Sequence, residues 1–77
     1  MDETRIDRLL STLNATEIGT LESIAEKLGE VREGLLLLEQ QALADRAGEA
    51  IEALRRGDIA EFKRGRAFLQ SKIGHLR

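Results

Sequence analysis

The sequence predicts an all-α protein of one domain, and three observations support this class. Proline is absent from the 77 residues. No segment alternates Val, Ile or Thr with polar residues, so strands have no support. Apolar residues recur instead at spacings of three and four over most of the chain, which indicates helices with one buried face.

The first predicted helix covers about residues 5–13, with Thr4 as its N-cap. Its apolar residues fall at helical spacing on one face: Ile6, Leu9, Leu10 and Leu13. Asn14 and Glu17 then have the spacing of a capping box, and Leu13 and Ile18 are placed for a hydrophobic staple. This arrangement predicts that a new helix begins directly after Asn14.

The second predicted helix is long, about residues 15–56. Its apolar positions follow a heptad spacing of 3-4-3-4-3-4: Leu21, Ile24, Leu28, Val31, Leu35, Leu38 and Ala42. After Ala42 the apolar pattern changes phase. Glycine costs ~1 kcal/mol relative to alanine inside a helix, so Gly29 and Gly48 mark the places where a break is expected.

The third predicted helix covers about residues 58–76 and folds back antiparallel on the end of the second. Arg55 and Arg56 suit a helix C-terminus, and Gly57 suits the left-handed position that follows it. Asp58 and Glu61 have the spacing of another capping box. The result is a helical hairpin or bundle with a short N-terminal helix.

Such a bundle leaves apolar surface uncovered. The first and third helices are too short to cover residues 27–37 of the long helix. Residues 35–38 are four consecutive leucines, which spread apolar surface around most of the helix. A domain of this size is marginally stable by itself, so we expect a homo-oligomer or a larger protein assembly to complete the core.

Leu37 and Phe68 lie off the apolar stripes of their helices. They are either ordinary exposed residues or a second contact surface. The predicted protein interface is formed by these residues: Leu21, Ile24, Leu28, Val31, Leu35, Leu36, Leu37, Leu38, Phe62, Arg66, Phe68 and Leu69.

Charged residues supply candidate electrostatic contacts. They are Glu22, Glu26, Glu30 and Glu33 on the long helix, and Lys63, Arg64 and Lys72 on the last one. The alternative is that the glutamates form a solvated face. Arg66 lies within the apolar stripe of the last helix, so we expect it to reach a carboxylate across an interface, for which Glu39, Glu49 and Glu52 are candidates.

The net charge of −2 conceals an asymmetry. Residues 1–54 hold five basic and twelve acidic residues, a net −7, whereas residues 55–77 hold seven basic and two acidic residues, a net +5. The basic last helix is the segment that would touch nucleic acid, although this is not the expected main role. The acidic N-terminus and the lack of a long apolar run predict no signal peptide and no membrane contact, hence the cytoplasm or a particle such as a virion assembled there.

The sequence offers little for catalysis, metal binding or cofactor binding. It has no cysteine and a single histidine, His75, and no phosphate-binding glycine loop is present. The serines have no recognisable base nearby in the sequence. We therefore expect a protein that is not an enzyme and holds neither a metal nor a cofactor.

Two segments resemble known families. Residues 20–43, which include Thr20-Leu-Glu-Ser-Ile-Ala-Glu-Lys-Leu-Gly-Glu-Val-Arg-Glu-Gly-Leu, resemble the helix-turn-helix of bacterial sigma factor region 4, which implies DNA binding as the alternative function. The pattern departs at Glu30, where an apolar residue is expected, and Leu36 and Leu37 would face DNA. Residues 53–69 resemble small helical accessory proteins of tailed bacteriophages, which implies a virion or assembly component.

Overall fold

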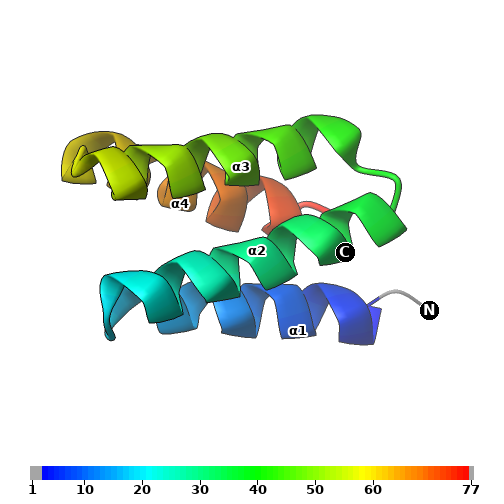
Figure 1. Cartoon of the computed structure of the whole chain (residues 1–77). Helices are drawn as coiled ribbons and strands as arrows, with labels where there is room; N and C mark the ends of the chain where they lie inside the picture. Colours follow the sequence, from blue (N-terminus) through cyan, green and yellow to red (C-terminus); the bar gives the residue numbers. More distant parts are fainter. Residues whose placement is uncertain (1–2, 77) are drawn as a thin grey trace.

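Four α-helices and one short 3₁₀-helix form the part of the chain that the computed structural model describes, residues 3–76 (Figure 1). The elements are α1 (Glu3–Asn14), η1 (Ala15–Glu17), α2 (Leu21–Leu37), α3 (Gln41–Arg56) and α4 (Ile59–Gly74). No strand occurs within these residues, so the all-α class is confirmed. The predicted N-cap Thr4 lies inside α1.

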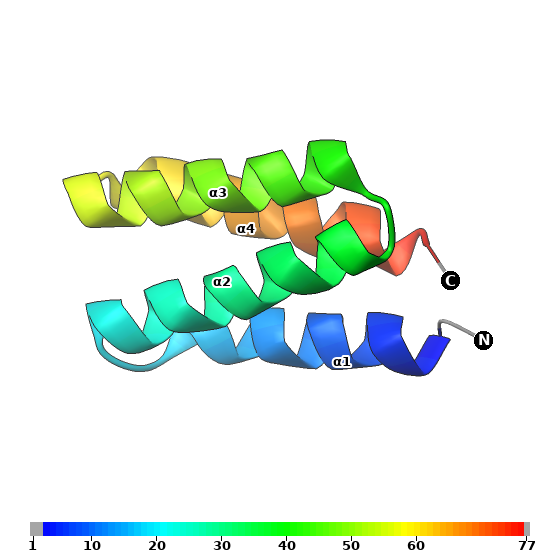
Figure 2. The same ribbon diagram turned by 45° about the vertical axis from the view of Figure 1, so that its right-hand side comes forward.

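The helices run alternately in opposite directions and form a closed ring (Figures 1 and 2). α1 packs against α2, α2 against α3, α3 against α4, and α4 against α1. The α1–α2 link and the α3–α4 turn lie at one end of the bundle, and the α2–α3 turn lies at the other. The core is therefore surrounded by helices of one chain.

The single helix expected over about residues 15–56 is in fact two helices. The break lies at residues 38–40, between α2 and α3, whereas Gly29 and Gly48 both lie inside helices. The break allows α3 to turn back and pack along α2. Burial of apolar surface between the two helices offsets the glycine cost at positions 29 and 48.

The α2–α3 turn is a Schellman motif that uses glutamate where glycine is usual. Glu39 has a positive φ of 59°. Its N–H donates to Leu36 O at 3.0 Å, and the Gln40 N–H donates to Leu35 O at 2.8 Å. These bonds satisfy the last carbonyls of α2. Because the left-handed residue is not glycine, the turn lacks the residue that usually marks a helix end in a sequence.

The α3–α4 turn has the same hydrogen bonds. The predicted left-handed Gly57 and the Asp58 cap are present, but the Glu61 side chain, which would complete the predicted capping box, accepts from Arg64 instead. Gly57 has φ 80°, its N–H donates to Leu54 O, and the Asp58 N–H donates to Ala53 O. Asp58 Oδ1 then accepts a hydrogen bond from the Glu61 N–H at 3.1 Å and caps α4. α4 consequently returns antiparallel along α3, as expected (Figure 1).

The predicted helix start after Asn14 is wrong. Asn14 makes no capping bond, and the cap of α2 is Thr20, whose Oγ1 accepts from the Ser23 N–H at 3.1 Å. Ile18 is 84% exposed, so the expected hydrophobic staple is not formed. The side chain of Glu17, the other half of the expected capping box, lies outside the described part. Asn14 Oδ1 instead accepts a hydrogen bond from Gln70 Nε2 at 2.8 Å, which ties α1 to α4.

The core is filled by large aliphatic side chains from three helices and by small residues from α3. The largest side chains with no exposed surface are Leu13 on α1, Leu28, Val31 and Leu35 on α2, and Leu69 and Ile73 on α4. The buried face of α3 is mainly alanine, and Gly65 on α4 lies opposite Ala50. Because residues 28, 31 and 35 are fully buried within one chain, the expectation that residues 27–37 lack intrachain cover is wrong.

Candidate interaction surface

The predicted interface residues fall into three groups in the folded chain. Those buried in its own core are Leu28, Val31, Leu35, Phe62 and Leu69. Those of intermediate exposure are Ile24, Leu36, Leu38 and Arg66. Those clearly exposed are Leu21, Leu37 and Phe68. Only the last group offers substantial apolar surface to a partner while the bundle stays intact.

Leu37 is the most exposed leucine among the described residues and lies at one end of a groove between α1 and α2. Its side chain is 71% exposed. The groove has a volume of about 770 Å³, and its lining includes Leu9, Thr12, Gly29 and Gly34. Gly29 leaves the backbone of α2 uncovered along the groove, whereas Gly34 is covered by the side chain of Leu9. This surface is therefore largely apolar, apart from its rims.

The two rims of the groove carry opposite charge. Arg5 and Arg8 line the α1 side, and Glu26, Glu30 and Glu33 line the α2 side. All five side chains are exposed. Among residues 3–76, none of the ion pairs involves any of them. The glutamate row is thus placed beside an apolar groove, with its charges available to another molecule.

Helical spacing explains why these residues share a surface. Residues 5, 8, 9 and 12 lie one turn apart on one face of α1, and residues 26, 29, 30, 33, 34 and 37 do so on α2. Sequence reasoning identified the glutamates and Leu37 but missed the α1 residues and both glycines. The spacing of Arg5, Arg8 and Thr12 was the signal that could have revealed them.

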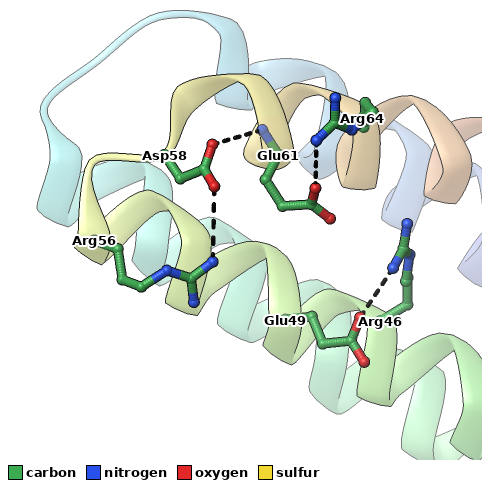
Figure 3. A network of polar contacts seen from close by, with 6 residues as sticks. All are labelled: Arg46, Glu49, Arg56, Asp58, Glu61 and Arg64. Carbon is green, nitrogen blue, oxygen red and sulfur yellow. Dashed lines mark hydrogen bonds and ion pairs between the residues drawn. The ribbon is translucent and has the colours of Figure 1, made fainter.

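The basic candidates on α4 make no ion pair with the glutamates of α2 within the described part of the chain. Arg64 Nη2 donates instead to Glu61 Oε2 on its own helix, at 2.6 Å (Figure 3). This hydrogen bond raises the pKa of the Arg64 guanidinium. Lys63 and Lys72 are exposed on α4. The other ion pairs in Figure 3, Arg46–Glu49 and Arg56–Asp58, likewise join near neighbours.

Phe68 belongs to a separate cluster on the α3–α4 side. Phe68 is 39% exposed, and two cationic side chains lie over its ring. Arg46 Cζ is 5.1 Å and Lys72 Nζ is 5.7 Å from the ring centroid. Arg46 Nη1 also contacts Glu49 Oε1 at 2.9 Å. The aromatic face is therefore partly covered by its own chain.

Arg66 was expected to reach a carboxylate of another chain. In the protomer, its Cζ lies 5.6 Å from the centroid of the Phe62 ring on the same helix, a cation–π arrangement. The expected contact with Glu39, Glu49 or Glu52 across an interface stays a prediction.

A second groove, of about 810 Å³, lies along the outer side of α3. Basic and acidic side chains are intermixed along its lining, among them Arg32, Glu49, Glu52 and Arg55. Only one large aliphatic side chain, Ile51, contributes to its lining. This groove lacks the apolar surface and the separation of charge that distinguish the α1–α2 groove.

The helix-turn-helix alternative requires a turn at Gly29. α2 instead continues without interruption from Leu21 to Leu37. The segment therefore has no separate recognition helix beginning near residue 30, and the glutamates that follow would repel phosphates.

Comparison of the chain with known protein families, with curated proteins and with solved structures found no match. Across residues 3–76, the helices are all too short or too polar to cross a membrane. The same residues contain no cluster of three or more acidic or histidine side chains arranged to hold a metal ion.

Proposed function

We propose that this protein is a non-catalytic helical interaction protein, a component of a larger protein assembly, and that it contacts other protein chains through the α1–α2 groove. The observation that carries the proposal is the exposure of Leu37 at the end of a groove with a largely apolar lining. Fully burying a leucine contributes about 1.5–3 kcal/mol, which is large compared with the stability of a small domain.

Gly29 supports the proposal independently. A Cβ atom at this position would meet nothing within 4 Å, so the packing of the protomer does not require glycine there. Glycine inside a helix nevertheless destabilises it by roughly 0.5–1 kcal/mol relative to alanine. A partner that packs against the exposed backbone of α2 would explain the glycine, because a larger side chain would block that contact.

The charged rims of the groove also favour a protein partner over a small apolar ligand. Charge complementarity at the rim of an interface chiefly orients the partners and raises the rate of association. The resemblance of residues 53–69 to accessory proteins of tailed phages supports an assembly role, with a virion component as the setting it suggests. A DNA-binding role has no comparable structural support, because α2 is continuous through Gly29.

The test compares two variants that remove an exposed apolar side chain. Leu37→Gln lies in the groove, whereas Ile59→Gln, the control, lies at the start of α4, and the native side chains are 71% and 45% exposed. Both variants should fold as the wild type does. Leu35→Asp should unfold the protein because Leu35 has no exposed surface.

The readouts are sedimentation of the purified protein and affinity capture from its native source, followed by cross-linking to locate the contact. We expect Leu37→Gln to weaken association while Ile59→Gln behaves as the wild type. If neither self-association nor capture of any protein depends on residue 37, the proposed function is wrong.

A further inference from the structure

The proposed function leaves the occupant of the α1–α2 groove unnamed. Resting on that function, we propose that the occupant is a second copy of this chain, which forms a two-fold dimer whose axis runs parallel to the helices of the bundle. The same surface of each protomer then faces the other, as a two-fold interface requires.

The charge on each rim is of one sign only, and this is the basis of the proposal. The α1 rim holds Arg5 and Arg8, and the α2 rim holds only glutamates. The opposite-sign charges whose side chains are described on these helices do not line the groove. Asp7 lines a different pocket beside Gln70, Lys27 Nζ donates a hydrogen bond to Ser23 Oγ at 2.9 Å, and Arg32 on α2 lies near Gly48 of α3.

A surface divided into a basic half and an acidic half is self-complementary in only one of two simple arrangements. A two-fold axis parallel to the helices places α1 of each copy over α2 of the other, so basic rims meet acidic rims. A two-fold axis across the helices places α1 over α1 and α2 over α2, so like charges meet. Like charges in apposition disfavour the second arrangement.

The register of the two helices brings specific residues together in the first arrangement. Leu9 on α1 lies beside Gly34 on α2, so the first turns of α1 are level with the last turns of α2. Rotation about an axis parallel to the helices preserves this level. Arg8 of one copy therefore arrives near Glu33 of the other, and the reciprocal pair forms at the same time.

The size of the surface sets the expected strength of association. α1 has 12 residues and is about 18 Å long, so two helices of this length offer less than the ~800 Å² per partner of a typical stable complex. We expect a dimer that dissociates on dilution. Sedimentation at protein concentrations from about 10 μM to about 1 mM would detect dimers with dissociation constants in that range.

Charge reversal tests the complementarity. Arg5→Glu/Arg8→Glu makes both rims acidic, and Glu30→Arg/Glu33→Arg makes both rims basic. Each variant alone should have a dimer dissociation constant at least about tenfold higher than the wild type, and an equimolar mixture should recover association. Arg32→Glu/Arg55→Glu, on exposed residues that line the other groove, makes the same change of charge, is the control and should leave association unchanged. Variants that associate as tightly alone as the wild type would overturn the proposal.

Gly29→Gln tests the groove without changing charge. The new side chain projects into free space, so the fold should be retained, as circular dichroism can verify. In the groove it should obstruct the second copy and abolish dimerisation over the same concentration range. Retention of wild-type association by a folded Gly29→Gln variant would place the contact elsewhere.

Disulfide trapping tests the direction of the axis. The chain has no cysteine, so single substitutions provide unambiguous reporters. A mixture of Thr12→Cys with Glu30→Cys should form the mixed disulfide, because α1 of one copy lies over α2 of the other. Thr12→Cys alone should not form a disulfide with itself; if it alone does, the other axis is correct.

Failure of this inference can be separated from failure of the proposed function. A wild-type protein that remains monomeric up to about 1 mM, while its capture of another protein still depends on Leu37, contradicts the dimer and retains the interaction role. If the wild-type protein neither dimerises nor captures another protein through Leu37, both the dimer and the proposed interaction role are wrong.

Discussion

Gly34 on α2 lies directly against the side chain of Leu9 on α1. A Cβ atom built at position 34 would overlap Leu9 Cδ2, with two further Leu9 atoms in contact. Leu9 is only 7% exposed, so it has little freedom to move aside. The close approach of α1 and α2, and with it the shape of the groove between them, therefore depends on the glycine.

Gly34→Ala should destabilise the protein by about 1 kcal/mol. The strain of overpacking costs ~1–3 kcal/mol and exceeds the ~1 kcal/mol that alanine contributes as a better helix former. Gly29→Ala is the matched control in the same helix and should stabilise the fold by about 0.5–1 kcal/mol, since its methyl group meets no neighbour. Urea unfolding followed by circular dichroism measures both free energies. Equal effects at the two positions would show that Gly34 is not tightly packed.

Glu39→Gly should stabilise the protein by about 0.5–1 kcal/mol. Glu39 is held at φ 59°, a left-handed conformation that costs a side-chain-bearing residue about 1–2 kcal/mol, part of which is recovered when glycine replaces it. Gly57→Ala makes the opposite change in the equivalent turn and should destabilise by about 1 kcal/mol, with no steric contact to confuse the result. Thermal unfolding can rank the variants. A destabilising Glu39→Gly would mean that the glutamate side chain, not its backbone, matters in the turn.

Thr20→Ala should cost about 1 kcal/mol because it removes the hydroxyl that accepts from the Ser23 N–H. Asn14→Ala should cost less than about 0.5 kcal/mol, since Asn14 caps no helix and its bond to Gln70 is exposed. Comparing the two variants distinguishes a helix that begins after Asn14, as the sequence suggests, from one capped by Thr20, as in the structure. The reverse order of the two effects would favour a helix that begins after Asn14.

Arg46 and Phe68 should be coupled by about 0.5–1 kcal/mol, because the guanidinium lies 5.1 Å from the ring centroid. A double-mutant cycle with Arg46→Met and Phe68→Leu isolates this energy from the Arg46–Glu49 ion pair. A parallel cycle with Lys72→Met compares the second cation above the same ring. Zero coupling in the first cycle would show that the stacking contributes nothing to stability in solution.

The fold was predictable where a local signal and the tertiary structure agree. Gly57 and Asp58 mark the α3–α4 turn because each residue type suits its backbone position. The α2–α3 turn was not predictable in the same way, since Glu39 takes a conformation that the sequence gives no reason to expect. The sequence did carry one indication of this break, the change of apolar phase after Ala42. Ala42 lies within four residues of the turn at residues 38–40.

The candidate site was predictable only in part, for a physical reason. Periodicity shows which residues share a helix face but not whether another helix of the same chain covers that face. Leu28 and Leu37 both looked like interface residues, yet the first is fully buried in the protomer and the second is exposed. Arg5 and Arg8 could not be recognised as part of the site from the sequence, because they line the groove only when α1 packs beside the glutamates of α2.

The ring of helices has a consequence for how rapidly the chain reaches its native state. Every packed pair of helices joins neighbours along the chain except α1 and α4. Proteins dominated by such local contacts fold in microseconds to milliseconds, and we expect the approach of α1 to α4 to come last. A polypeptide that folds this quickly leaves its leucines uncovered only briefly, which limits the opportunity for aggregation during synthesis.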